Sequence, residues 1–266
     1  MTIFMHYTKR ALKEPLGIAI YIVAPLVMVL ITTLVNQYAA DEFQGAAVMA
    51  NGRDLVVSVN VFMNLIMFQF MGILLVVDPL HVDIRRDMRW RLLAAPVPPV
   101  KFVFGCMFGH YVFALLSGLL IIAGGFVMGG YMFTPWVPVA VLALVGIIAM
   151  LMGTLFFYLF KSLAVANTLG TVFTFGMAIP QGIMIMADFP TPVQTFGQYF
   201  TPLAWAFRAI IYSSDEASEM MTQFFFNQQH SFTRGMPGAL MNLGLLAAFA
   251  AVLAVIVVLV SRRKAV

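Results

Sequence analysis

Apolar residues along the chain gather in runs whose lengths match a membrane crossing, for which a helix needs about 20 residues. Residues 136–186 are too long for one crossing, so the pattern requires a tight turn at Lys161 and Ser162. It predicts an all-α membrane protein with six transmembrane helices, built as one domain over residues 1–266. The predicted spans are residues 16–35, 55–77, 102–127, 136–160, 163–186 and 239–260.

Basic residues favour one orientation of these spans. With the N-terminus inside, the inside segments hold 12 of the 15 lysines and arginines, and the outside segments hold Arg53, Arg208 and Arg234. Lysine and arginine are enriched in cytoplasmic loops. The sequence therefore predicts a multi-pass protein of the cell (inner) membrane with both termini in the cytoplasm.

Composition agrees with a lipid environment, because 62% of the residues are hydrophobic and 10% are charged. Soluble domains have about 45–50% apolar and about 25% charged residues. The net charge of +4 is not gathered into a basic patch among aromatic residues, so it does not indicate nucleic-acid binding. A single cysteine, Cys106, excludes an intrachain disulfide and is interpreted as a packed apolar residue.

The N-terminal segment, residues 1–15, has an amphipathic pattern. Ile3, Phe4, Tyr7 and Ala11 share one helical face, with basic residues between them. We expect a helix lying flat at the cytoplasmic interface. The alternative is a positively charged flank of the first span.

Residues 78–101 form the long cytoplasmic loop, and its helical spacing predicts a short amphipathic helix that prolines at 96, 98 and 99 terminate. Held between two spans, this helix would be a rigid projection on which a soluble partner could push. Residues 187–237 are external, and their first half is apolar but broken by proline. A re-entrant hairpin in the outer leaflet accommodates both properties.

Several kinds of chemistry are missing from the sequence. A phosphate-binding loop needs a glycine-rich turn before Lys-Ser/Thr, whereas Phe160 precedes Lys161 and Ser162. The chain is therefore not expected to be an enzyme or to bind a cofactor. The four histidines are scattered, so no metal site is predicted; His110, inside a span, is either packed or a ligand contact. No span has an interior carboxylate, which disfavours an ion-coupled carrier and implies that energy comes from another subunit.

Neutral polar residues form stripes in the second and fifth spans. They act either as hydrogen bonds between helices or as the lining of a path for an amphipathic solute. The candidates for lining are Asn60, Asn64, Asn167, Thr171, Thr174 and Gln181. Gly105 and Gly109 form a small-xxx-small pair, which is typical of close helix packing.

Three stretches together resemble the ABC-2 type permeases, the membrane subunits of one class of ATP-binding-cassette exporters. They are the amphipathic N-terminal segment, the charged loop that leads through Arg91-Leu-Leu-Ala-Ala-Pro96, and the proline-rich stretch ending in Phe200-Thr-Pro-Leu-Ala-Trp-Ala-Phe-Arg208. Many relatives carry glycine and glutamate just before Arg-Leu-Leu, where this chain has Asp87 to Trp90. The contact with an ATPase is therefore expected to depend more on arginine than on a carboxylate.

The resemblance implies a permease subunit that passes a hydrophobic or amphipathic solute (a drug, lipid or lipid-linked molecule) along its interface with a second permease subunit. Two ABC ATPase subunits would bind ATP and Mg. It assigns ATPase coupling to Asp83, Arg85, Arg86, Asp87, Arg89, Trp90, Arg91, Leu92, Leu93 and Pro96. It assigns an outer gate to Pro190, Pro192, Phe196, Phe200, Pro202, Trp205 and Arg208.

Two other functions stay open from the sequence, a non-transporting membrane scaffold or assembly factor and an ion-coupled secondary carrier. Peptide or glycan substrates also remain open, as does the choice between homodimer and heterodimer.

Overall fold

The described part of the chain is helical. The computed structural model describes residues 3–31, 34, 61–85, 98–128, 133–178, 192, 196–197, 200–215 and 236–263. Within these residues there are helices and turns and no strand, so the predicted all-α class is confirmed. The elements are α1 (Ile3–Ala11), α2 (Pro15–Ile18), the π-helix η1 (Ala19–Val23), α5 (Gly72–Arg85), α7 (Pro99–Met128), α8 (Trp136–Leu159), α9 (Leu163–Ala178), α11 (Pro202–Ile211) and α13 (Met236–Arg263).

Four helices among the described residues are long and apolar enough to cross a membrane: Val61–Arg85, Val100–Gly124, Trp136–Leu159 and Met236–Arg263. Shorter apolar helices occupy Ala19–Ile31, Leu163–Met177 and Pro202–Ile211. The first and fifth predicted spans contain two of these shorter helices, and their residues 32–33, 35 and 179–186 lie outside the described part. The structure therefore supports a multi-pass protein, while the count of six spans stays a prediction.

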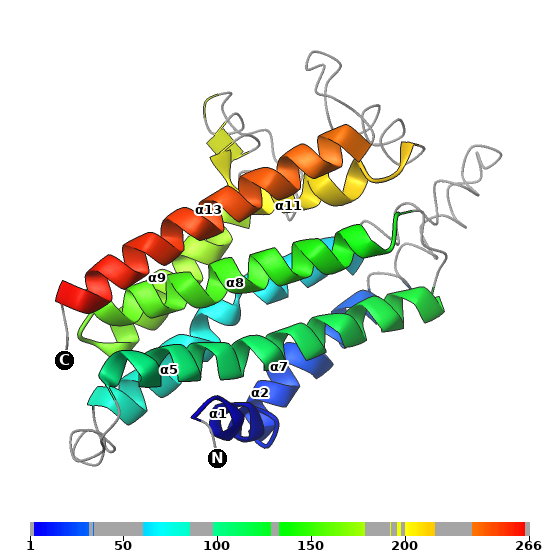
Figure 1. Ribbon diagram of the computed structural model, residues 1–266. Coiled ribbons are helices and arrows are strands. Elements are labelled where there is room, and N and C mark those ends of the chain that lie inside the picture. The colour runs from blue at the N-terminus through cyan, green and yellow to red at the C-terminus, as the bar shows by residue number, and fades with distance from the viewer. Residues whose placement is uncertain are drawn as a thin grey trace.

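Helix α8 lies at the centre of the bundle, where it packs against α5, α7 and α13 (Figure 1). Glycine permits the closest of these approaches. A Cβ atom on Gly153 of α8 would lie 2.5 Å from the carbonyl oxygen of Ile73 in α5, so the two backbones are nearly in contact. Small residues serve this purpose in membrane helices, since dispersion contacts between backbones replace the missing hydrophobic driving force.

Two helices extend further than the hydropathy pattern predicted. Helix α5 continues through Pro79 to Arg85, although the apolar run ends at Val77. Helix α7 begins at Pro99, a first-turn position where proline needs no hydrogen-bond partner. Its 30 residues correspond to about 45 Å at 1.5 Å per residue, well beyond a hydrocarbon core of about 30 Å. Asp83 and Arg85 therefore belong to the helix of the second span rather than to a separate loop helix.

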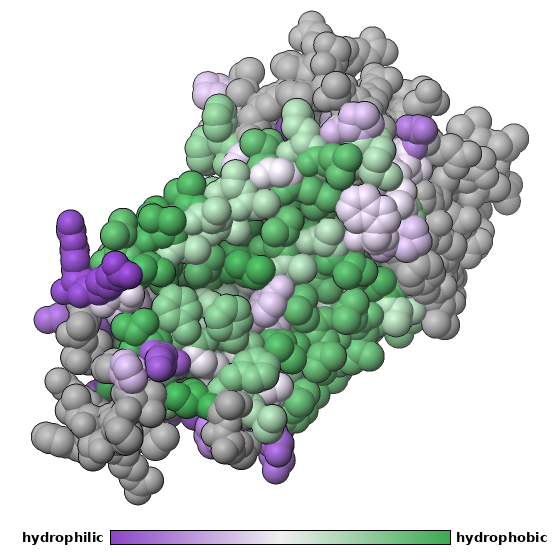
Figure 2. All heavy atoms as spheres, viewed as in Figure 1, coloured by the Kyte–Doolittle hydropathy of each residue, from purple (hydrophilic) through white to green (hydrophobic). Residues whose placement is uncertain are grey.

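Polar and apolar surfaces are separated along the bundle. Figure 2 shows a broad apolar band, with hydrophilic side chains gathered at the end where α13 finishes. We call this the basic end, because all the described lysines and arginines except Arg208 lie there. They are Lys9, Arg10, Lys13, Arg85, Lys101, Lys161, Arg262 and Arg263. This is the separation that the positive-inside argument uses, but which side of the membrane the basic end faces stays a prediction.

Candidate functional site

Helix α1 is packed directly against the first half of α7 at the basic end (Figure 1). The contact runs over the two glycines of the small-xxx-small pair. A Cβ atom on Gly105 would lie 2.6 Å from Cγ2 of Ile3, and one on Gly109 would lie 2.6 Å from Cβ of Tyr7. Thr8 also donates a hydrogen bond to the carbonyl oxygen of Gly109, at 3.3 Å. Residues 3–11 are thus helical, with Tyr7 and Ala11 buried and Phe4 exposed, while the position of this helix at the cytoplasmic interface stays a prediction.

A buried carboxylate joins α1 to the last turn of α5. The phenol of Tyr7 donates to Oδ2 of Asp83 at 2.7 Å, and the guanidinium of Arg10 reaches the same oxygen at 2.7 Å. Asp83 is only 4% exposed, and the two hydrogen bonds that its carboxylate accepts compensate for its lost hydration. Burial raises the pKa of Tyr7, which keeps the phenol protonated and able to donate. The hydrogen bond to Asp83 raises the pKa of Arg10.

Two residues further on, the side chain of Arg85 binds the C-terminal end of α8. Its guanidinium donates to the carbonyl oxygens of Phe157 at 2.6 Å and Phe160 at 2.5 Å. Its Cζ atom also lies 4.6 Å from the centre of the Phe157 ring. The last carbonyls of a helix have no partner within the helix, and a cation there also interacts favourably with the helix dipole. His81 lies beside this contact, with Nε2 3.1 Å from the Phe160 oxygen. Arg85 therefore fastens α5 to the turn at residues 160–162 between α8 and α9.

Among the predicted coupling residues, Asp83 and Arg85 are described, and both make contacts within the bundle. These contacts place the two residues at the base of the loop, and neither contact tests a role in binding an ATPase. The other predicted coupling residues lie outside the described part of the chain. They are Arg86, Asp87, Arg89, Trp90, Arg91, Leu92, Leu93 and Pro96.

The predicted lining residues fall into different environments. Asn167 of α9 donates to Oδ1 of Asp78 in α5 at 2.7 Å, which joins the fifth-span stripe to the second span. Thr174 is 1% exposed and donates to the carbonyl oxygen of Gly170 in its own helix. Asn64 and Thr171 are half-buried. Asn60 and Gln181 lie outside the described residues, and the lining role of the whole set stays a prediction.

The proline-rich stretch that the sequence predicts to be external includes one helix, α11. Thr201 caps its N-terminus by accepting from the backbone amide of Ala204, and Pro202 occupies the first turn. Ten residues extend about 15 Å, too short to span a membrane. Among the remaining gate candidates, Trp205 packs edge-on against Phe249 of α13, and Arg208 is 6% exposed. Other described members are exposed, namely Pro192, Phe196 and Phe200, while Pro190 lies outside the described residues.

The contacts that join these helices were missed by sequence reasoning. Tyr7 and Asp83 are separated by 76 positions, and the partners of Arg85 by 72 and 75. The glycine pair was a usable signal for close packing, but nothing in it identified α1 as the partner. No group of three metal-ligating side chains is found in the described ranges, and the prediction that no metal is bound stays untested.

Comparison with known families identifies one match. Residues 33–259 match the profile of a family described as "ABC-2 family transporter protein", which covers most of the chain from just after the first apolar helix to near the end of α13. A search of the curated proteins found no match.

Proposed function

Because the chain belongs to the ABC-2 family of transporter proteins, we propose that it is the permease subunit of an ATP-driven exporter. The family itself consists of membrane components of ABC transporters, which work with ABC ATPase subunits and are not nucleotide-binding enzymes. The proposal adds the direction of transport, the pairing with a second permease subunit and the solute. The solute is hydrophobic or amphipathic (a drug, a lipid or a lipid-linked molecule) and passes between the two subunits.

The observation that carries the proposal is the network at the basic end. Asp83 joins α5 to α1, and α1 in turn packs on α7. Arg85 joins α5 to the turn between α8 and α9. Residues 86–97 connect α5 to α7 and are therefore attached at both ends to helices that are already fastened together. A displacement of this segment acts on several membrane helices at once.

Polar contacts of this kind are well suited to transmit force. Charge-assisted hydrogen bonds have a preferred distance and direction, so the helices that they join keep their relative positions when one is pushed. Two ABC ATPases that close on ATP would press on residues 86–97 and move α1, α5, α7 and the α8–α9 turn together. Without such contacts, the push would bend the connecting segment and leave the spans in place.

The proposal is tested by co-purification. The chain is expressed with an ABC ATPase encoded beside it, and the complex is isolated through a tag on the permease in the presence and absence of ATP. We expect the ATPase to co-purify and its hydrolysis rate to change on reconstitution with the permease. Absence of association in both nucleotide states would contradict the proposal.

Charge reversals then locate the contact. Arg89→Glu and Arg91→Glu are expected to weaken ATPase association, since both lie in the segment assigned to coupling. Arg262→Glu is the matched control, because Arg262 is an exposed residue of the last turn of α13 at the same end of the bundle. Equal association of the ATPase with all three variants would show that residues 86–97 are not part of the contact. Arg85 is left unchanged in this series, since it holds the end of α8.

A further inference from the structure

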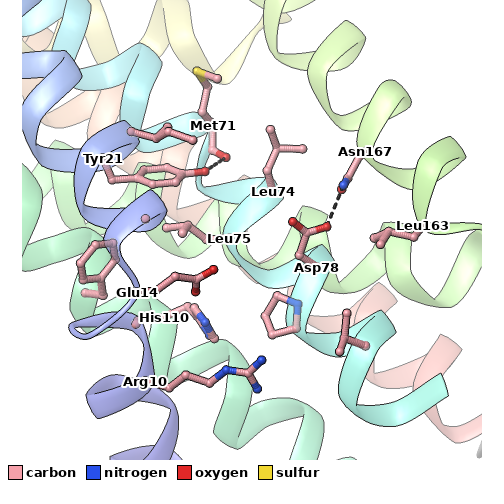
Figure 3. A pocket seen from close by; sticks show the side chains of 16 residues that line it. Arg10, Glu14, Tyr21, Met71, Leu74, Leu75, Asp78, His110, Leu163 and Asn167 are labelled. Carbon is pink, nitrogen blue, oxygen red and sulfur yellow. Dashed lines mark hydrogen bonds between the residues drawn. The ribbon is translucent and has the colours of Figure 1, made fainter. Parts of the chain in front are cut away.

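A cavity of about 440 Å³ opens at the basic end, on the side of α5 that faces α2 and α9 (Figure 3). Its walls come from α1, α2, η1, α5, α7 and α9, so it lies where the N-terminal helices meet three helices of the bundle. Small-molecule sites typically measure about 300–1,000 Å³. The cavity is therefore large enough for a drug-sized molecule or a lipid headgroup with the first part of its chains.

One part of the lining is apolar and aromatic. It is formed by Ile20, Tyr21, Leu74, Leu75 and Phe113. The rings of Tyr21 and Phe113 are in edge-to-face contact, with their centroids 6.3 Å apart. Tyr21 is held in place by a hydrogen bond from its phenol to the carbonyl oxygen of Met71, at 2.9 Å. This part suits a hydrophobic body, and its aromatic faces can attract a cation.

The other part of the lining carries an excess of negative charge. Its charged residues are Arg10, Glu14 and Asp78. Arg10 is paired with Asp83, which lies outside the cavity. Glu14 and Asp78 form no ion pair within the described residues, although Glu14 lies near enough to Arg10 to help raise the pKa of that guanidinium, after the larger effect of Asp83. Figure 3 shows the two carboxylates pointing toward the same space. The amide oxygen of Asn167 is also buried without a hydrogen-bond partner in the described structure.

Asp78 carries the negative charge whose position most favours a bound cation. It is exposed, yet it lies on the Val61–Arg85 helix, seven positions before its end. That distance is about 10 Å along a helix, within reach of the inner headgroup region. An ionisable side chain on a membrane helix is costly unless it is paired or faces a polar cavity. The hydrogen bond from Asn167 engages one carboxylate oxygen and neutralises no charge.

We propose that this cavity binds an amphipathic organic cation, with its charged head between Glu14 and Asp78 and its apolar body against Tyr21 and Phe113. The proposal rests on the proposed function and narrows its solute to cationic amphiphiles, taken up from the inner-leaflet side of the bundle. An anion of the same shape would meet two unpaired carboxylates and an arginine whose charge is already compensated. A neutral molecule would leave both carboxylates unpaired.

Two sources can supply such a head, a soluble amphipathic amine and the ammonium group of an aminophospholipid. The shared chemistry is a cationic head on an apolar body, so the first experiment uses probes that isolate charge. Tetraphenylphosphonium and tetraphenylborate have nearly the same size and shape and opposite charge. Binding of each is measured by equilibrium dialysis against the full chain in dodecyl maltoside micelles, with protein-free micelles subtracted.

The wild-type chain is expected to bind tetraphenylphosphonium at least about tenfold more tightly than tetraphenylborate, a difference of about 1.4 kcal/mol. The double variant Glu14→Gln, Asp78→Asn is expected to lose this preference. Asp215→Asn is the matched control, because Asp215 is an exposed carboxylate beyond α11, and it should keep the preference. Equal binding of the two ions to the wild type, or an unchanged preference in the double variant, would overturn the proposal.

The single variant Glu14→Gln is the folding control, since the Glu14 side chain is exposed and, among the described residues, only the backbone of Glu14 makes hydrogen bonds. It should lower the preference about threefold while the thermal unfolding midpoint stays at the wild-type value. Retention of the full preference in this correctly folded variant would count against the proposed position of the head.

Competition then separates the two sources. Phosphatidylethanolamine and phosphatidylglycerol are titrated into the micelles that hold tetraphenylphosphonium. Displacement by phosphatidylethanolamine alone identifies an aminophospholipid as the source, and displacement by neither identifies a soluble cation; both outcomes support the cation site. Equal displacement by both lipids would contradict selection by charge. Because no ATPase is present, failure here leaves the co-purification result, and with it the proposed permease, unaffected.

Discussion

The two ends of the helix bundle differ in whether charged side chains join their helices. At the basic end, Asp83 and Arg85 make short polar contacts to segments more than 70 positions away in the chain. At the opposite end, α11 lies against α13 and α8, with Trp205 packed edge-on against Phe249. A neutral hydrogen bond from the hydroxyl of Thr134 to the carbonyl oxygen of Ser213, at 2.8 Å, links the residues before α8 to those after α11. The hydroxyl of Thr201 donates to the carbonyl oxygen of Gly197 and accepts from the amide of Ala204, both neutral hydrogen bonds.

This difference bears on how the ends respond to force. Charge-assisted hydrogen bonds are shorter and roughly twice as strong as neutral ones, so helices joined by several of them keep one arrangement. Apolar packing is non-directional, and packed helices can slide over each other in small steps. We expect the basic end to move as a unit and α11 to shift relative to its neighbours, as an outer gate would have to do.

The largest effect is expected where α1 crosses α7. In Gly109→Ala, the new methyl group would lie 2.6 Å from Cβ of Tyr7 and 3.0 Å from two backbone atoms of α1. Such overpacking should lower the free energy of unfolding by about 3 kcal/mol, because α1 must move off α7. The measurement is reversible unfolding in mixed micelles followed by circular dichroism.

Gly244→Ala is the control for this substitution. A Cβ atom on Gly244 of α13 meets nothing within 4 Å, so the change affects only helix propensity. It should raise the free energy of unfolding by up to about 1 kcal/mol. A loss of stability in both variants, equal in size, would show that the glycines act through helix propensity and not through the contact with α1.

The second effect concerns the end of α8. Arg85→Lys keeps the charge but cannot place two donors on the carbonyls of Phe157 and Phe160, since an ammonium is a point charge and a guanidinium is a planar fork. We expect a loss of about 2 kcal/mol in unfolding free energy. Arg262→Lys, at an exposed position of α13, should change it by less than about 0.5 kcal/mol. Identical values for the two variants would mean that Arg85 does not hold this turn.

Hydropathy predicted the helical class and the turn near Lys161 well, because the period and length of apolar runs depend directly on contact with lipid. The helix that contains the second predicted span extends further than the apolar run. The run stops at Val77, while α5 continues to Arg85, since Pro79 and Asp78 can be accommodated where neighbouring helices and a polar cavity surround them. Hydropathy alone therefore assigns the charged residues after position 77 to a loop.

The site was harder to predict than the fold. Asn167 was correctly noticed as a polar residue on an apolar helix, but its partner Asp78 was counted as part of the loop. Asp83 was selected for its charge and a family likeness, whereas its contacts are with Tyr7 and Arg10. Contacts between distant segments depend on how helices pack, and a single sequence shows only the periodicity of each helix.

The third effect isolates the contribution of the Tyr7 hydroxyl group from that of its aromatic ring. Tyr7→Phe keeps the packing against α7 and removes the donor to Asp83, so we expect a loss of about 1.5 kcal/mol at neutral pH. Burial raises the pKa of Tyr7 above its ordinary value of about 10. The contribution is therefore complete below about pH 10 and declines above it, as the unfolded state deprotonates first. Unfolding free energies of both proteins from pH 7 to 11 should converge only at the alkaline end. A gap that closes near pH 7 would exclude the phenol as the donor.

The smallest effect is expected at the opposite end, where only a local cap is removed. Thr201→Ala deletes the side-chain oxygen that accepts from the amide of Ala204 at 3.3 Å, and should cost about 1 kcal/mol. Thr168→Ala, at an exposed position of α9, controls for the change of residue type and should stay within about 0.5 kcal/mol of the wild type. Amide hydrogen exchange provides the sharper readout, because a local cap protects only its own helix. We expect Thr201→Ala to speed exchange in α11 alone, whereas Gly109→Ala should speed it in α1, α5 and α7 together. Faster exchange throughout the bundle in Thr201→Ala would mean that α11 is coupled to the spans as firmly as the basic end is, and the distinction between the two ends would fail.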